Sequence, residues 1–154
     1  MKLLSSAKPA KLITSAHPGN PSTVEQESLR EYIVGAELTC VYFVRDYVQL
    51  AFEGEYPSTL TLLTDPTIFS GGTAFAWSDL AHHGALCQQI DHIVTAASIV
   101  PDEMLELIFD NDARLVASLR PEDAVGPEMV IFQAADTTWW VLQTGMHRQT
   151  ERYN

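Results

Sequence analysis

Hydrophobic and polar residues alternate over several short stretches, which is the pattern of half-buried β-strands. Three such stretches, joined by short turns, make up a first group: 38–44, 47–52 and 59–63. In the middle stretch Val48, Leu50 and Phe52 fall on one face. Strands separated by turns this short pair with their neighbours, so the group predicts a three-stranded antiparallel meander.

The same pattern returns in the second half of the chain. A second meander is predicted from three stretches, 93–100, 103–109 and 114–119. Two further alternating stretches, 128–132 and 138–142, predict a C-terminal hairpin. Between the two groups, 67–77 has no clean period and contains Ser70-Gly71-Gly72, which predicts a flexible loop.

A short helix is predicted ahead of each meander. Ser22 begins a capping box and Gly35 is a helix terminator. The pair Ser78-Asp79 is expected to cap a second helix that extends to Ile90 and is interrupted near Gly84.

Shifting the chain by 57 residues superposes the two halves. Leu50 then falls on Leu107 and Phe52 on Phe109, and Leu29 falls on Leu86. An internal repeat is therefore expected. The predicted fold class is α+β, with the two meanders joined in one curved, mostly antiparallel sheet or packed as two sheets, beside two short helices. The expected organisation is an N-terminal tail at 1–22, one domain at 23–144 and a C-terminal tail at 145–154. Within the domain, repeat A covers 23–64, repeat B covers 79–119 and the C-terminal hairpin covers 128–142.

Composition restricts the function. A chain of 154 residues suits one domain. Its formal net charge is −11, and all three lysines, Lys2, Lys8 and Lys11, lie in the first eleven residues. A body this acidic repels phosphate backbones and anionic membrane surfaces, so neither nucleic acid nor membrane is an expected partner. It attracts a basic molecule instead.

No apolar stretch has the length of a signal peptide, so a cytoplasmic location is expected. Cys40 and Cys87 form no Cys-x-x-Cys motif and are expected to be reduced, buried thiols.

Motifs for catalysis or metal binding are weak. On a helix, Asp79 would lie near both His82 and His83, but adjacent histidines diverge by about 100° and no His-Glu-x-x-His pattern exists. Asp79 is better explained as a capping or first-turn acid and the histidines as surface or rim groups. The sequence therefore predicts no metal, no cofactor and no catalytic residue.

The sequence resembles a group of small bacterial proteins with tandem β-meander repeats. The residues that carry the resemblance are Ile33 to Leu38, followed by Leu50-Ala51-Phe52-Glu53-Gly54. A second copy runs through Ile90-Asp91-His92-Ile93-Val94 and Leu105 to Asn111, with His92 and Asn111 where that pattern has glycine. Several such proteins are similar to immunity proteins encoded beside polymorphic toxins, which implies a protein partner and no catalytic residues.

The leading hypothesis is a non-enzymatic, acidic protein-binding domain, in one form a toxin-neutralising immunity protein. Its predicted contact residues are the acids of hairpin 102–112 and an outward tryptophan: Asp102, Glu103, Glu106, Asp110, Asp112, Trp139 and Trp140. Neighbours on a strand face opposite ways, so either one tryptophan is core and the other outward, or both are packed.

Two alternatives stay open. The first is a small-molecule-binding protein or enzyme with a pocket between the repeats, lined by Trp77, His82, His83 and Cys87. The second is a structural homo-oligomer that pairs strands edge to edge.

Overall fold

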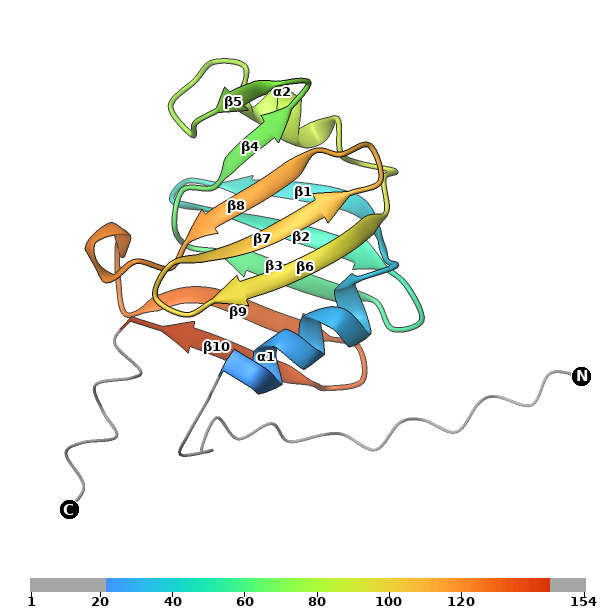
Figure 1. The fold of residues 1–154 in the computed structure, drawn as a ribbon. Coiled ribbons are helices and arrows are strands. Elements are labelled where there is room, and N and C mark those ends of the chain that lie inside the picture. The colour runs from blue at the N-terminus through green and yellow to red at the C-terminus, as the bar shows by residue number, and fades with distance from the viewer. Residues whose placement is uncertain (1–21, 145–154) are drawn as a thin grey trace, which may run out of the picture.

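Strands in residues 22–144, the part of the chain that the computed structural model describes, form two antiparallel sheets that pack face to face (Figure 1). The predicted tails, 1–22 and 145–154, lie outside the described residues except for Ser22. Sheet A has the order β1-β2-β3-β9-β10, with bounds Glu37–Val44, Tyr47–Glu53, Ser58–Leu62, Glu128–Ala134 and Trp139–Gln143. Sheet B has the order β5-β4-β8-β7-β6, with bounds Thr73–Phe75, Thr67–Ser70, Arg114–Ser118, Met104–Phe109 and Val94–Val100.

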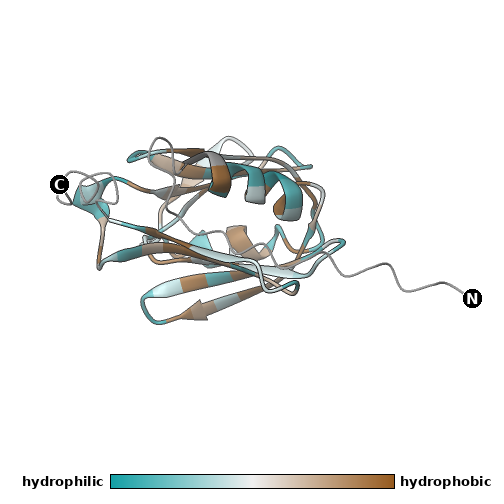
Figure 2. Cartoon of the chain, turned by 90° about the horizontal axis from the view of Figure 1, so that it is seen from below, coloured by the Kyte–Doolittle hydropathy of each residue, from teal (hydrophilic) through white to brown (hydrophobic). Residues whose placement is uncertain are grey.

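Short helices complete the described chain. They are α1 (Ser22–Ser28), its π-helical continuation η1 (Leu29–Ile33), α2 (His82–Cys87) and the 3₁₀ turn η2 (Pro121–Asp123). Together with the strands they confirm the predicted α+β class, in its two-sheet form. Figure 2 views the two layers edge-on, with α1 in the layer of sheet B and β10 in the opposite layer. No helix in this part of the chain is long and apolar enough to cross a membrane.

The two repeats exchange strands. Sheet A joins the first meander, β1-β2-β3, to the last hairpin, β9-β10. Sheet B joins the second meander, β6-β7-β8, to the hairpin β4-β5 that follows the first meander. Each half of the chain therefore completes the sheet of the other half.

Backbone hydrogen bonds at the corner between the sheets confirm the internal repeat. Residues 37 and 93 form an isolated β-bridge, and the four backbone bonds around it form two equivalent pairs. One bond of a pair becomes the other when 56 is added to the residue number from the first repeat and subtracted from the number from the second. The bonds are Gly35 N–H to Val94 O and Asp91 N–H to Leu38 O, both 2.8 Å, and Leu38 N–H to His92 O and Val94 N–H to Ala36 O, both 3.0 Å. The offset is 56 here and 57 in β2 and β7, because the turn after β6 has one residue more than the turn after β1.

The core lies between the inner faces of the sheets. In sheet A, Leu50, Leu60, Phe132 and Trp140 form one cross-strand row and are all buried. The Trp140 indole N–H donates to Ser28 Oγ of α1 at 2.9 Å, which satisfies the polar atom of the largest core side chain. Trp140 is 3% exposed and Trp139 is 55% exposed, so the tryptophan pair divides between core and surface.

Helix α1 closes the outer edge of β6. The Gln26 side-chain amide donates to Ala97 O at 2.8 Å and accepts from Ile99 N–H at 2.7 Å. The amide thus takes the place of a neighbouring strand, which removes an unpaired edge from sheet B.

Several local expectations were wrong. Residues 67–77 contain the hairpin β4-β5, whose turn is formed by Gly71 and Gly72 at φ +58° and +80°. Two glycines with positive φ suit a two-residue hairpin turn, so the segment is ordered. Helix α2 begins only at His82, because Asp79 accepts from Ala76 N–H at 2.6 Å in a turn before the helix and does not cap it. Cys87 is exposed at the end of α2 and Cys40 is half-buried on β1, so neither thiol is buried as expected. His82 is buried and is not a surface group.

Candidate functional site

Between the ends of its strands, the outward side chains of sheet A form a surface without charge. Buried and outward residues alternate along β2, and the pairing carries this alternation across all five strands. We call this surface the outer face of sheet A, and its members are Cys40, Tyr42, Val44, Tyr47, Gln49, Ala51, Thr59, Thr61, Ile131, Gln133, Trp139 and Val141. An uncharged face of this extent is unusual on a chain of net charge −11.

Two aromatic side chains stand out from this face on opposite edge strands. Tyr42 on β1 is 50% exposed, and Trp139 on β10 is 55% exposed. A hydrogen bond with the Cys40 side chain raises the pKa of Tyr42 above its ordinary value. The phenol is therefore neutral at physiological pH, and the face stays uncharged.

The face is hollowed beside Trp139, toward the end of the face that holds Glu53. A shallow depression of about 330 Å³ is lined in part by one outward row, which contains Ala51, Thr59 and Gln133. Glu53 and Pro57 close one end of it. Trp139 is paired with Gln133 and therefore stands at the depression's β10 side.

Acidic residues surround the uncharged face. Glu37 and Glu53 are the outward residues at one end of β1 and β2, and they pair directly with each other, although like charges in that position destabilise a sheet. Asp46 lies in the turn at the other end of the same hairpin. Across residues 22–144, nineteen acidic residues stand against four arginines, Arg30, Arg45, Arg114 and Arg120. The field around the face is thus negative and favours a basic neighbour.

The contact residues predicted from the sequence fall into separate places. Asp102 and Glu103 lie in the turn before β7, and Asp112 lies in the turn after it, at the strand's other end. Glu106 lies midway and forms an ion pair with Arg114, whose Nε donates at 3.0 Å.

Trp139 belongs to the outer face of sheet A, on the opposite side of the sandwich from this hairpin. Trp140 is enclosed in the core. The structure does not bring the acidic hairpin and the exposed tryptophan together.

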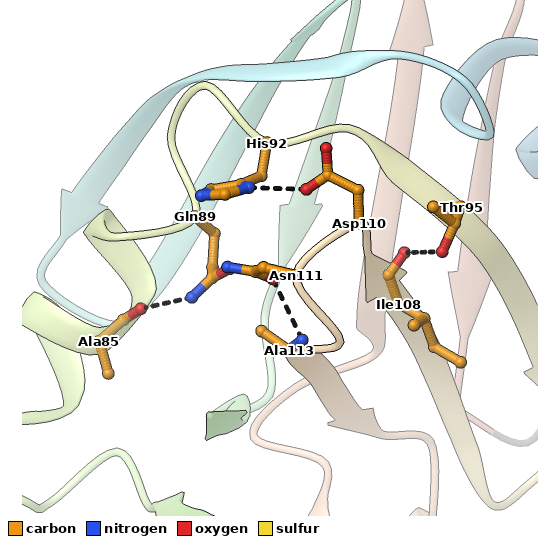
Figure 3. Close-up of polar contacts among 8 residues, drawn as sticks. All are labelled: Ala85, Gln89, His92, Thr95, Ile108, Asp110, Asn111 and Ala113. Atoms are coloured by element: carbon orange, nitrogen blue, oxygen red, sulfur yellow. Dashed lines mark hydrogen bonds and ion pairs between the residues drawn. The ribbon is translucent and has the colours of Figure 1, made fainter. Parts of the chain in front are cut away.

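Asp110 and its neighbours hold the β7–β8 turn against the segment after α2 (Figure 3). His92 Nδ1 and Asp110 Oδ1 are 2.6 Å apart, and this hydrogen bond lowers the pKa of the Asp110 carboxyl. Beside them the buried Gln89 accepts from Asn111 Nδ2 at 2.9 Å and donates to Ala85 O at 3.1 Å. These contacts assign the turn a structural role.

Three of the four predicted pocket residues lie together. His83 stacks on Phe43 of β1 with ring centroids 4.0 Å apart, and Trp77 lies 5.0 Å from His83 and 5.2 Å from His82. Cys87 is exposed on the last residue of α2. The rings pack against one another as a small aromatic cluster.

The protonation of this histidine pair follows from its hydrogen bonds. His82 Nε2 lies 2.7 Å from Pro66 O, which can only accept, so Nε2 carries the proton. His82 Nδ1 therefore accepts from His83 Nδ1–H at 3.2 Å. Burial lowers the pKa of His82, which keeps it neutral. Within residues 22–144 no group of three or more His, Cys, Asp or Glu side chains could hold a metal ion.

Fold and surface together define an α+β sandwich with an internal repeat and one uncharged, aromatic sheet face. No family model, curated protein or solved structure matches this chain. The outer face of sheet A was missed from the sequence, although a signal existed. Every second residue of the alternating stretches at 40–44, 47–51, 59–61, 131–133 and 139–141 lacks charge, on the side away from the core.

Proposed function

We propose that this protein is a protein-binding domain whose contact surface is the outer face of sheet A. The observation that carries the proposal is the absence of charge from the middle of a five-stranded face that exposes Tyr42 and Trp139. The centres of protein interfaces are depleted of charged residues and enriched in Tyr and Trp. Large aromatic side chains of this kind supply most of the binding energy at such contacts.

The surrounding acids indicate the chemistry of the partner. A partner with an apolar centre and a basic rim would set its cations against Glu37, Glu53 and Asp46, while Tyr42 and Trp139 anchor the middle. Charges at the rim steer association more than they strengthen the complex. Neutralising a basic toxin domain is one function that fits this chemistry, and it extends the proposal to a particular partner class.

The test is affinity capture from a lysate of the organism that carries the gene. The full chain serves as bait in three forms: wild type, the double variant Tyr42→Ala/Trp139→Ala, and the control Leu80→Ala. Leu80 is fully exposed and lies outside the outer face of sheet A, so it controls for loss of a surface hydrophobic residue. Removing an interface anchor costs about 2 kcal/mol, which weakens binding roughly 30-fold.

The proposal is supported if a basic protein is retained by wild type and by Leu80→Ala, and is lost from the double variant. It is overturned if all three baits retain the same proteins equally, or if wild type retains none. A fourth bait, Asp102→Asn/Glu103→Gln, tests the hairpin expected from the sequence. Loss of the partner from this bait alone would assign the contact to sheet B.

A further inference from the structure

The β10 edge of sheet A is the starting point, because the other sheet edges of residues 22–144 are covered or short. Gln26 and the corner bonds close β6. The first half of β1 is bonded to the segment before β6, and α2 flanks its second half, where His83 stacks on Phe43. β5 has three residues. β10 has five, and it forms the lower border of sheet A in Figure 1.

The register shows which backbone groups of β10 face outward. Ala134 N–H donates to Thr138 O at 2.8 Å, so this pair is hydrogen-bonded. In an antiparallel ladder hydrogen-bonded pairs alternate with pairs that are not hydrogen-bonded. The backbone N–H and C=O groups of Trp140 and Leu142 therefore point toward β9. The N–H and C=O groups of Trp139 and Val141 therefore point away from sheet A. No hydrogen bond joins them to any other part of the described chain.

Residues 137–144 also lack the charged and proline residues that normally prevent strand pairing. Their sequence is Thr-Thr-Trp-Trp-Val-Leu-Gln-Thr. Proteins usually protect an exposed edge with lysine, proline or a covering segment.

We propose that a second copy of this chain pairs with β10, antiparallel and centred on Trp140. In that register Trp139 lies opposite Val141 of the partner subunit, and Val141 lies opposite the partner's Trp139. Both pairs present outward backbone groups to each other, so four N–H···O=C bonds form across the two-fold axis. The two copies of sheet A become one ten-stranded sheet.

Self-pairing fits this edge because the strand is its own complement. The exposed Trp139 ring lies beside the half-buried Val141 of the partner subunit on the same face, and aromatic–β-branched neighbours stabilise antiparallel pairs. Two bodies of charge −11 repel, and an uncharged strand is where they approach at least cost. A basic strand from another protein would find no carboxylate along 137–144 to pair with.

One strand pair is a small contact, so the dimer is weak and depends on concentration. It also enlarges the uncharged surface, since both outer faces lie on one side of the joined sheet. The inference does not depend on the proposed partner, because the edge is argued from backbone groups and the face from side chains.

Amide hydrogen exchange by NMR, beside sedimentation, tests the proposal over a range of about 10 μM to about 1 mM. The amides of Trp139 and Val141 are expected to become at least tenfold more protected as concentration rises. The amides of Trp140 and Leu142, bonded to β9, serve as an internal control and stay protected throughout.

Two variants separate the edge from the face. Val141→Pro removes an outward N–H without touching the β9 bonds and is expected to leave a monomer at every concentration. If the proline variant fails to fold, Val141→Lys replaces it, because two lysines brought together at the paired edge repel each other and prevent the dimer. Ile131→Lys adds a lysine to the same face one strand inward and is expected to dimerise as wild type does.

Two results overturn the proposal. Trp139 and Val141 amides that stay exposed at about 1 mM, with a monomer by sedimentation, exclude a second copy. The same amides protected at about 10 μM in a monomer would show that another segment of the same chain covers the edge.

Discussion

Gln26 allows a direct test of how α1 closes sheet B. Its amide makes two hydrogen bonds to the β6 backbone, at 2.8 Å to Ala97 O and 2.7 Å from Ile99 N–H. A hydrogen bond contributes about 1 kcal/mol net, and a partly buried backbone group left without its partner adds to the loss. Gln26→Ala is therefore expected to lower the free energy of unfolding by about 2 kcal/mol.

Urea denaturation followed by tryptophan fluorescence measures this change. A loss of about 2 kcal/mol moves the midpoint by roughly 1 M at the m-values usual for a chain of this size. Gln49→Ala is the matched control, since its amide makes one 3.2 Å bond to Thr61 Oγ1 on the outer face of sheet A. The control is expected to change stability by less than about 0.5 kcal/mol. Equal effects for the two variants would refute the argument that Gln26 replaces a strand.

Three further outcomes follow from buried or strained positions. Trp140→Phe removes the indole N–H from the buried Ser28 hydroxyl and is expected to lower the free energy of unfolding by about 2 kcal/mol, while Trp139→Phe on the surface changes it little. Burial lowers the pKa of His82 below its ordinary 6.5, so the unfolded chain binds more protons than the folded chain. The free energy of unfolding is therefore expected to fall as the pH drops below about 6.5. His82→Phe is expected to flatten that part of the pH profile of urea midpoints. Gly72→Val forces a β-branched residue to φ +80° and is expected to lower the melting temperature through about 1–2 kcal/mol of strain.

Much of the fold could be predicted, because strand alternation is a local property. The two meanders and the C-terminal hairpin lie where the alternation places them, and the bulges at Leu38/Cys40 and Val94/Ala96 occupy equivalent positions in the two repeats. The exchange of hairpins could not be predicted, since no local pattern records which sheet β4 or β9 joins. The β4-β5 hairpin was missed although Gly71-Gly72 is a hairpin turn signal, because its strands are too short to show a period.

The candidate site was harder to predict, because nearness in sequence does not show which face a residue occupies. The acids of 102–112 are dense in sequence, yet Glu106 forms an ion pair with Arg114 from the next strand and Asp110 is hydrogen-bonded to His92. The outer face of sheet A is the reverse case. Its members come from five strands, so the absence of charge becomes visible only when the strand order is known.

The exchange of hairpins has a consequence for how the polypeptide assembles. Cleaving the link near residue 78 would leave two fragments, each with a complete meander and a hairpin that fits only the other fragment's sheet. Neither piece can satisfy its own strand edges, so the fragments are expected to be unfolded apart and to regain structure when mixed. During synthesis, sheet B has all its strands once β8 has left the ribosome, whereas sheet A is incomplete until β10 follows.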